Sequence, residues 1–267
     1  MTESTDPHST PELLPPSLTR DARRWLLAGG LLLMAGALVL AGVTGTAEAL
    51  RWFAVVVVVW SLVGWQCYRR LHLNRGAMDV PLFNRLGAGN HTTLARGLLI
   101  AATAGFVVLP SDSLPTVGWY LPALFYTAAA LGDGLDGYLA RRQDHTTRLG
   151  AELDTELDAL GLVVAPILAV MHGKLHASYL LVSLAYYLFQ WGIYWRRQRE
   201  RPVYPLPPSR MRRYLAGLQM ALVAIVLWPP VPPFPSQVAG AVVMTPLLIG
   251  FIRDWLHVSG RLGEHTS

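Results

Sequence analysis

The feature that most limits how this chain can fold is a series of long apolar runs separated by short polar or basic stretches. Because lipid offers backbone groups no hydrogen-bond partner, such runs are helical when they cross a bilayer, and about 20 residues suffice to span it. We therefore predict an all-α, polytopic membrane bundle of eight helices. The runs cover about residues 25–43, 50–67, 94–110, 118–140, 150–171, 175–195, 212–228 and 236–256.

Composition and charge agree with a membrane protein. The chain is 52% hydrophobic and 15% charged, with a net charge of +5. The basic residues lie between apolar runs rather than on a separate polar domain, so we expect contact with membrane lipids and no nucleic-acid partner. If the eight helices alternate in direction, 20 of the 22 Lys and Arg residues fall on one side and only Arg51 and Lys174 on the other. The positive-inside rule then places both termini and the loop 141–149 in the cytoplasm, as in a bacterial inner-membrane protein.

The pattern predicts a core of six helices preceded by two additional ones. We expect a flexible cytoplasmic tail (1–24), two extra transmembrane helices (25–70), a cytoplasmic connector (71–93), a six-helix transmembrane domain (94–257) and a cytoplasmic tail (258–267).

Four aspartates interrupt the apolar runs. Asp133 and Asp136 are spaced i,i+3 and Asp154 and Asp158 i,i+4, so each pair shares one helix face. The basic loop 141–149 would join the two helices as an antiparallel hairpin and bring the pairs together. A charged group at mid-membrane costs about 2.5–3.5 kcal/mol on insertion scales. Carboxylate oxygens suit Mg²⁺ or Mn²⁺, so the sequence predicts a site for two divalent cations.

Other interpretations of the aspartates are a proton relay or neutralisation by helical arginines. A relay seldom needs two facing pairs with glycines at fixed offsets. Arg141 and Arg148 are too few to neutralise four aspartates together with Glu152 and Glu156, for which the sequence gives no account. A cation-coupled transporter remains the alternative function, and a membrane scaffold with a decayed site is a third possibility.

Eight positions around the aspartates follow a fixed spacing, Asp-x-x-Asp-Gly-x-x-Ala-Arg, eight residues, Gly-x-x-x-Asp-x-x-x-Asp. This pattern resembles the signature of the CDP-alcohol phosphatidyltransferases, integral membrane phospholipid synthases. The upstream segment from Asn90 to Arg96 resembles the Asn-x-x-Thr-x-x-Arg segment that opens their first core helix. The resemblance covers about residues 88–256. The signature positions are Asp133, Asp136, Gly137, Ala140, Arg141, Gly150, Asp154 and Asp158.

The resemblance implies transfer of a phosphatidyl group from CDP-diacylglycerol, or another CDP-alcohol, to a polar alcohol with release of CMP. It implies that Asp133, Asp136 and Asp154 are metal ligands, and that Asp158 is both a metal ligand and the general base. We further expect a homodimer. The residues expected around the CDP moiety are Asp133, Asp136, Gly137, Ala140, Arg141, Gly150, Asn90 and Thr93.

The acceptor alcohol is not fixed by the sequence. Phosphatidylglycerophosphate synthases usually have a proline and a lysine around the last two aspartates, whereas this chain has Thr155 and Ala159 there. Gly137 and Gly150 would let a base or phosphate approach the backbone, although small residues also permit tight helix packing. Most arginines of the 196–213 stretch suit anionic lipid. The candidates for acceptor or phosphate contact are Arg96, Arg148, Arg210, Arg212 and Arg213.

Overall fold

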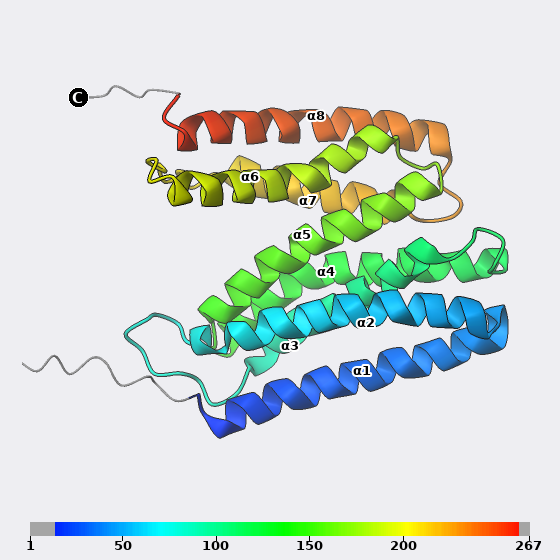
Figure 1. Cartoon of the computed structure of the whole chain (residues 1–267), viewed down its shortest axis with the longest axis horizontal. Helices are drawn as coiled ribbons and strands as arrows, with labels where there is room; N and C mark the ends of the chain where they lie inside the picture. The colour runs from blue at the N-terminus through cyan, green and yellow to red at the C-terminus, as the bar shows by residue number, and fades with distance from the viewer. Residues whose placement is uncertain (1–13, 262–267) are drawn as a thin grey trace, which may run out of the picture.

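The computed structural model describes residues 14–261, which form eight α-helices and contain no strand. The predicted all-α polytopic bundle is confirmed. Short 3-10 turns flank some of the helices. Most of the helices run roughly along the long axis of the molecule, whereas α5 is inclined to it (Figure 1). The helices are α1 (Pro16–Thr44), α2 (Thr46–Arg69), α3 (Gly87–Gly105), α4 (Tyr120–Arg142), α5 (Arg148–Met171), α6 (Leu180–Gln198), α7 (Arg210–Val226) and α8 (Pro233–Val258).

Four of the described helices are long and apolar enough to cross a membrane: α1, α2, α3 with its following 3-10 turn, and α8. Large apolar side chains on α1 point away from the protein, and Leu38 and Val39 are about 70% exposed. An apolar exterior of this kind suits lipid rather than water. By contrast, α4 and α5 are not among these four helices despite their length, and they carry the charged aspartates.

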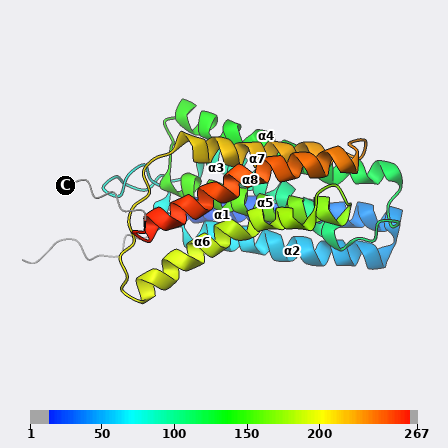
Figure 2. The same ribbon diagram turned by 90° about the horizontal axis from the view of Figure 1, so that it is seen from above.

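Helix α3 lies at the centre of the half of the bundle that carries the aspartates. It packs against α2, α4 and α5, while α5 crosses the bundle obliquely towards α6, α7 and α8 (Figures 1 and 2). The end of α2, the start of α3, the end of α4 and the start of α5 gather at the same end of the molecule, on the left in Figure 1. This arrangement brings residues from three helices to one site.

The beginning of the chain differs from the expectation. Helix α1 begins at Pro16, a favourable residue for the first turn, and Leu18 and Ala22 in its first two turns are fully buried. Residues 16–24, expected in the flexible tail, are therefore helical. The prediction of a flexible tail was wrong for residues 16–24, because Leu18 and Ala22 are buried against the rest of the protein. Residues 1–13 and 262–267 of the two predicted tails lie outside the described part of the chain.

Two tryptophans of α2 pack on glycines, one on α1 and the other on α3. Trp60 lies against Gly29, and its Nε1 donates to the carbonyl of Leu26 at 3.0 Å. Trp52 packs in the same way on Gly105 of α3. The two extra helices are thus packed directly on the core.

Gly29→Ala is expected to lower the melting temperature in detergent by several degrees. A β-carbon at residue 29 would overlap the Trp60 ring, and overpacking costs about 1–3 kcal/mol. Gly42→Ala is the matched control on the same helix, since nothing lies within 4 Å of its β-carbon position. That change is expected to be neutral or slightly stabilising because alanine favours the helix. Equal melting temperatures for the two variants would contradict this packing.

Candidate active site

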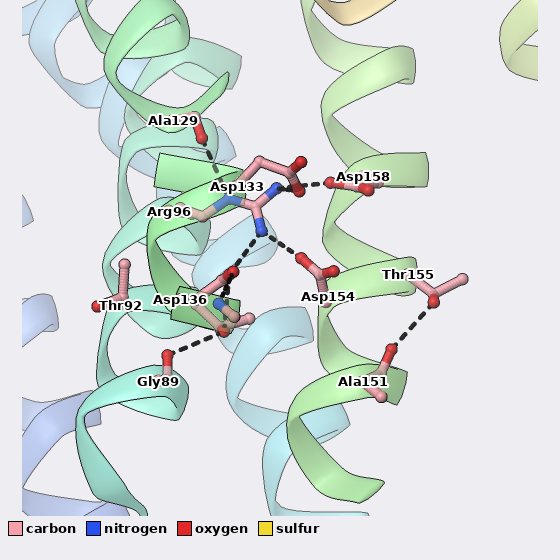
Figure 3. Close-up of polar contacts among 12 residues, drawn as sticks. Gly89, Thr92, Arg96, Ala129, Asp133, Asp136, Ala151, Asp154, Thr155 and Asp158 are labelled. Carbon is pink, nitrogen blue, oxygen red and sulfur yellow. Dashed lines mark hydrogen bonds and ion pairs between the residues drawn. The ribbon is translucent and has the colours of Figure 1, made fainter. Parts of the chain in front are cut away.

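The candidate site lies where α3, α4 and α5 meet, with Arg96 of α3 at its centre. The Arg96 side chain is only 2% exposed, and its guanidinium contacts all four aspartates (Figure 3). Its Nη2 lies 2.9 Å from Asp133 and 2.5 Å from Asp158, while its Nη1 lies 2.9 Å from Asp136 and also pairs with Asp154. The two aspartate pairs are therefore brought together, as the hairpin spacing predicted.

Arg96 is also held by the backbone of α4. Its Nε donates to the carbonyl oxygen of Ala129 at 3.1 Å, which restrains the orientation of the guanidinium. The sequence placed Arg96 among the acceptor candidates and did not count it among the arginines that could neutralise the aspartates. Its position between the carboxylates shows that it does pair with them.

Asp136 differs from the other three aspartates. It is 6% exposed, and its Oδ2 accepts hydrogen bonds from Thr93 Oγ1 at 3.1 Å and from Arg96. Its Oδ1 accepts from the backbone N–H of Gly137 at 2.7 Å. The other three carboxylates are partly exposed, at 31–41% of their side-chain surface. They are therefore more accessible to a ligand than Asp136 is.

The donor set fits divalent cations. Carboxylate oxygens of Asp133, Asp154 and Asp158 all lie within 4.8 Å of one another. Hard oxygen ligands are those that Mg²⁺ and Mn²⁺ prefer. When ionised, the four aspartates carry a charge of −4 and Arg96 carries +1, so a charge of −3 remains to attract cations. The cluster can therefore hold metal by its chemistry and by its charge.

A cavity of about 440 Å³ opens beside the aspartates. Ten predicted site residues line it, whereas Asp158 lines a separate cavity of about 190 Å³ towards α6, α7 and α8. A volume of this order lies within the range of small-molecule and cofactor sites. The ten residues are Asn90, Thr93, Asp133, Asp136, Gly137, Ala140, Arg141, Gly150, Asp154 and Arg213.

The predicted acceptor arginines are dispersed. Arg213 lines the larger cavity, whereas Arg212 pairs with Asp254 of α8 at 3.1 Å. Arg148 and Arg210 are exposed and line neither of the two cavities beside the aspartates. Of these candidates, the structure thus brings Arg96 to the aspartates and Arg213 to the larger cavity.

Asn90 does not cap α3, because that helix begins three residues earlier at Gly87. Its Nδ2 instead donates to Asn74 Oδ1 at 3.0 Å and to Thr147 Oγ1 at 3.1 Å. Thr147 in turn caps α5, accepting from the backbone N–H of Gly150 at 3.0 Å. Sequence reasoning missed Thr147, although a threonine just before an apolar helix is a known capping signal.

Gly150→Ala is expected to destabilise the junction of α3 and α5. A β-carbon there would lie 2.5 Å from Asn90 Oδ1 and 3.3 Å from Thr147 Oγ1, and overpacking costs about 1–3 kcal/mol. Gly134→Ala is the control, because nothing lies within 4 Å of its β-carbon position. Thermal unfolding should show a lower melting temperature for Gly150→Ala alone. A drop of equal size in both variants would mean that close packing at residue 150 is unimportant.

Comparison with known proteins places the chain in a family. The family model for CDP-alcohol phosphatidyltransferase matches residues 86–252, from the start of α3 into α8. The chain belongs to the CDP-alcohol phosphatidyltransferase family. Membership in this membrane enzyme family, together with the long apolar helices, indicates an integral membrane protein and does not favour the transporter interpretation.

Curated relatives share part of this region. A protein from Haemophilus influenzae is 39% identical over 94 residues, 35% of this chain and 44% of the relative. Proteins from Salmonella typhimurium and Escherichia coli are 38% and 36% identical over 80 residues, 30% of this chain and 42% of each relative. All three are named CDP-diacylglycerol–glycerol-3-phosphate 3-phosphatidyltransferase. The chain thus matches less than half the length of these relatives, and no solved structure matches it.

Proposed function

We propose that this protein transfers a phosphatidyl group from CDP-diacylglycerol, or a related CDP-alcohol, to a polar alcohol and releases CMP. The observation that carries the proposal is the convergence of four aspartates from α4 and α5 around Arg96, beside a cavity that Asp133, Asp136 and Asp154 help to line. Because the chain belongs to a family named for CDP-alcohols, we infer that this cluster binds a pyrophosphate and its counter-ions.

Asp158 is proposed as the general base. The acceptor oxygen attacks the phosphatidyl phosphorus, the bond from that phosphorus to the bridging oxygen breaks, and CMP leaves with that electron pair. The proton of the acceptor hydroxyl passes to a carboxylate oxygen of Asp158, which lines the smaller cavity. Asp133, Asp136, Asp154 and Asp158 would hold two divalent cations, Mg²⁺ or Mn²⁺, which supply charge stabilisation for the phosphates.

The larger cavity is proposed to hold the CDP moiety. Gly137 and Ala140 leave space along α4, and the Arg141 guanidinium lies next to Gly137. Asn90 and Thr93 line the opposite side from α3. Arg213, the predicted acceptor arginine that lines this cavity, is proposed to contact a phosphate of the donor or of the acceptor, since guanidinium matches phosphate geometry.

The proposed setting is a bacterial inner membrane, with the site facing the cytoplasm and the protein acting as a homodimer. The charge asymmetry of the sequence supports this orientation. Helices α3–α8 would form the catalytic domain, with α1 and α2 as an added hairpin. A cytoplasmic site would let a water-soluble acceptor meet a donor that enters from the lipid.

The test is CMP release by the purified protein with CDP-diacylglycerol, Mg²⁺ or Mn²⁺ and a panel of acceptors. Glycerol 3-phosphate heads the panel because the matched relatives are named for it, followed by glycerol, inositol phosphate and serine. Mass spectrometry of the lipid product identifies the acceptor. Absence of CMP with every acceptor would refute the proposed function.

A further inference from the structure

Two turns of α5 carry carboxylates on opposite faces. Asp154 and Asp158 face α3 and α4, whereas Glu152 and Glu156 face the end of α2. Residues two apart on a helix lie about 200° apart, so each face has its own i,i+4 pair. Each pair is met by a single arginine, Arg96 of α3 on one face and Arg70, directly after α2, on the other.

Arg70 forms a network with both glutamates. Its Nε lies 2.9 Å from Glu152 Oε2, and its Nη2 lies 2.8 Å from Glu156 Oε1. Its Nη1 donates to Gln66 Oε1 one turn earlier, and Gln66 Nε2 donates to Glu156 at 3.4 Å. The Arg70 side chain is 11% exposed, whereas Glu152 and Glu156 are 45% and 30% exposed, so these charge-assisted bonds are shielded from water mainly on the arginine side.

The segment after α2 adds a second attachment to α5. The carbonyl of Arg75 accepts a hydrogen bond from the backbone N–H of Arg148 at 2.9 Å, in the first turn of α5. Asn74, fully buried, accepts from Asn90 at 3.0 Å, and Asn90 also contacts the cap residue Thr147. The start of α5 is therefore held by residues that precede α3 in the chain.

Arg70, Asn74 and Arg75 lie outside the region that matches the family model, which begins at residue 86. We propose that Arg70 is a positioning residue, through which the α1–α2 hairpin sets the rotation of α5 and so the placement of Asp154 and Asp158. Without Arg70, two carboxylates on one face of α5 lose their shared partner, and the helix turns to hydrate them. A metal and phosphate site tolerates displacements of only about 0.5 Å.

The test uses full-length protein in nanodiscs and Mn²⁺ as the probe, with bound Mn²⁺ measured by electron paramagnetic resonance. Mn²⁺ binding by the Asp158→Asn variant serves as the reference for Mn²⁺ bound outside the aspartate site. Arg70→Gln is expected to raise the Kd for Mn²⁺ about tenfold and to lower kcat for CMP release about tenfold, the scale of losses when outer partners of metal ligands are changed. The KM for CDP-diacylglycerol should change little, because Arg70 does not line the larger cavity, which is proposed to hold the CDP moiety.

Arg69→Gln is the matched control. Arg69 is the adjacent residue and is exposed, with its guanidinium 4.6 Å from the centre of the Trp65 ring. Both changes remove one positive charge from the same helix end. Loss of charge alone would strengthen cation binding, so weaker binding in Arg70→Gln alone identifies a change of geometry. Arg70→Lys keeps the charge but loses the planar guanidinium that can bind both glutamates at once. Its Kd for Mn²⁺ should lie between those of wild type and Arg70→Gln.

Failure of this inference can be distinguished from failure of the proposed function. The inference rests on the proposed function only for the measurement of CMP release. If wild-type protein releases no CMP, the proposed function fails while the Mn²⁺ measurements still test Arg70. Folded Arg70→Gln protein with wild-type Mn²⁺ affinity would overturn the inference. If Arg70→Gln does not fold, Arg70→Lys takes its place, and a wild-type Kd in that variant would overturn the inference equally.

Discussion

Asp158→Asn is expected to abolish CMP release while leaving the fold intact. Asparagine keeps the shape of the side chain and can still accept the hydrogen bond that Arg96 Nη2 donates at 2.5 Å. It cannot take the proton of the acceptor hydroxyl, and it removes one charge from the metal-binding cluster. A lost general base alone lowers turnover by about a hundredfold or more.

The measurement for Asp158 is kcat for CMP release, with the melting temperature recorded on the same preparations. Asp112→Asn is the control, because Asp112 is exposed in the turn between α3 and α4 and lines no cavity beside the aspartates. That variant should keep wild-type turnover. Retained turnover in Asp158→Asn would remove this residue from the role of base and direct the search to another aspartate of the cluster.

Arg96→Met is expected to destabilise the metal-free protein strongly. Arg96 is the shared partner of all four aspartates, so its removal leaves four facing carboxylates without their cation. Removing one partner of a buried ion pair costs about 3–5 kcal/mol. Divalent cations bind the folded state and should restore much of this stability.

Thermal unfolding in EDTA and in Mg²⁺ tests this prediction for Arg96. The increase in melting temperature on adding Mg²⁺ should be larger for Arg96→Met than for wild type. Arg212→Met is the control, since it also breaks an arginine–aspartate pair, with Asp254, but the Arg212 side chain is 35% exposed, against 2% for Arg96. Such pairs contribute about 0–1 kcal/mol. Equal melting temperatures in EDTA for wild type and Arg96→Met would contradict the central place given to Arg96.

Much of the fold follows from the sequence because the apolar runs are long and their separators are short. The eight predicted segments correspond to α1–α8, and the spacing of the aspartates correctly placed each pair on one helix face. Helix ends were less accurate. The arginines at 20, 23 and 24 suggested that α1 starts at Trp25, but burial of Leu18 and Ala22 extends it to Pro16.

The contacts between helices could not be predicted because one sequence does not give their register. Arg70 lies 82 residues before Glu152, and spacing alone cannot show that α2 ends beside those turns of α5. Likewise, the position of Arg96 was compatible with a phosphate contact, and only the packing of α3 between α4 and α5 shows that it pairs with the aspartates. The two glutamates left unexplained by the sequence are explained by Arg70.

The dependence of CMP release on divalent cations tests the central claim most directly. Purified protein supplied with CDP-diacylglycerol and its acceptor is first treated with EDTA and then titrated with Mg²⁺ or Mn²⁺. The aspartate cluster predicts no CMP in EDTA and recovery on addition of either cation, because donor phosphates and facing carboxylates repel one another without it. Undiminished CMP release in EDTA would contradict the account.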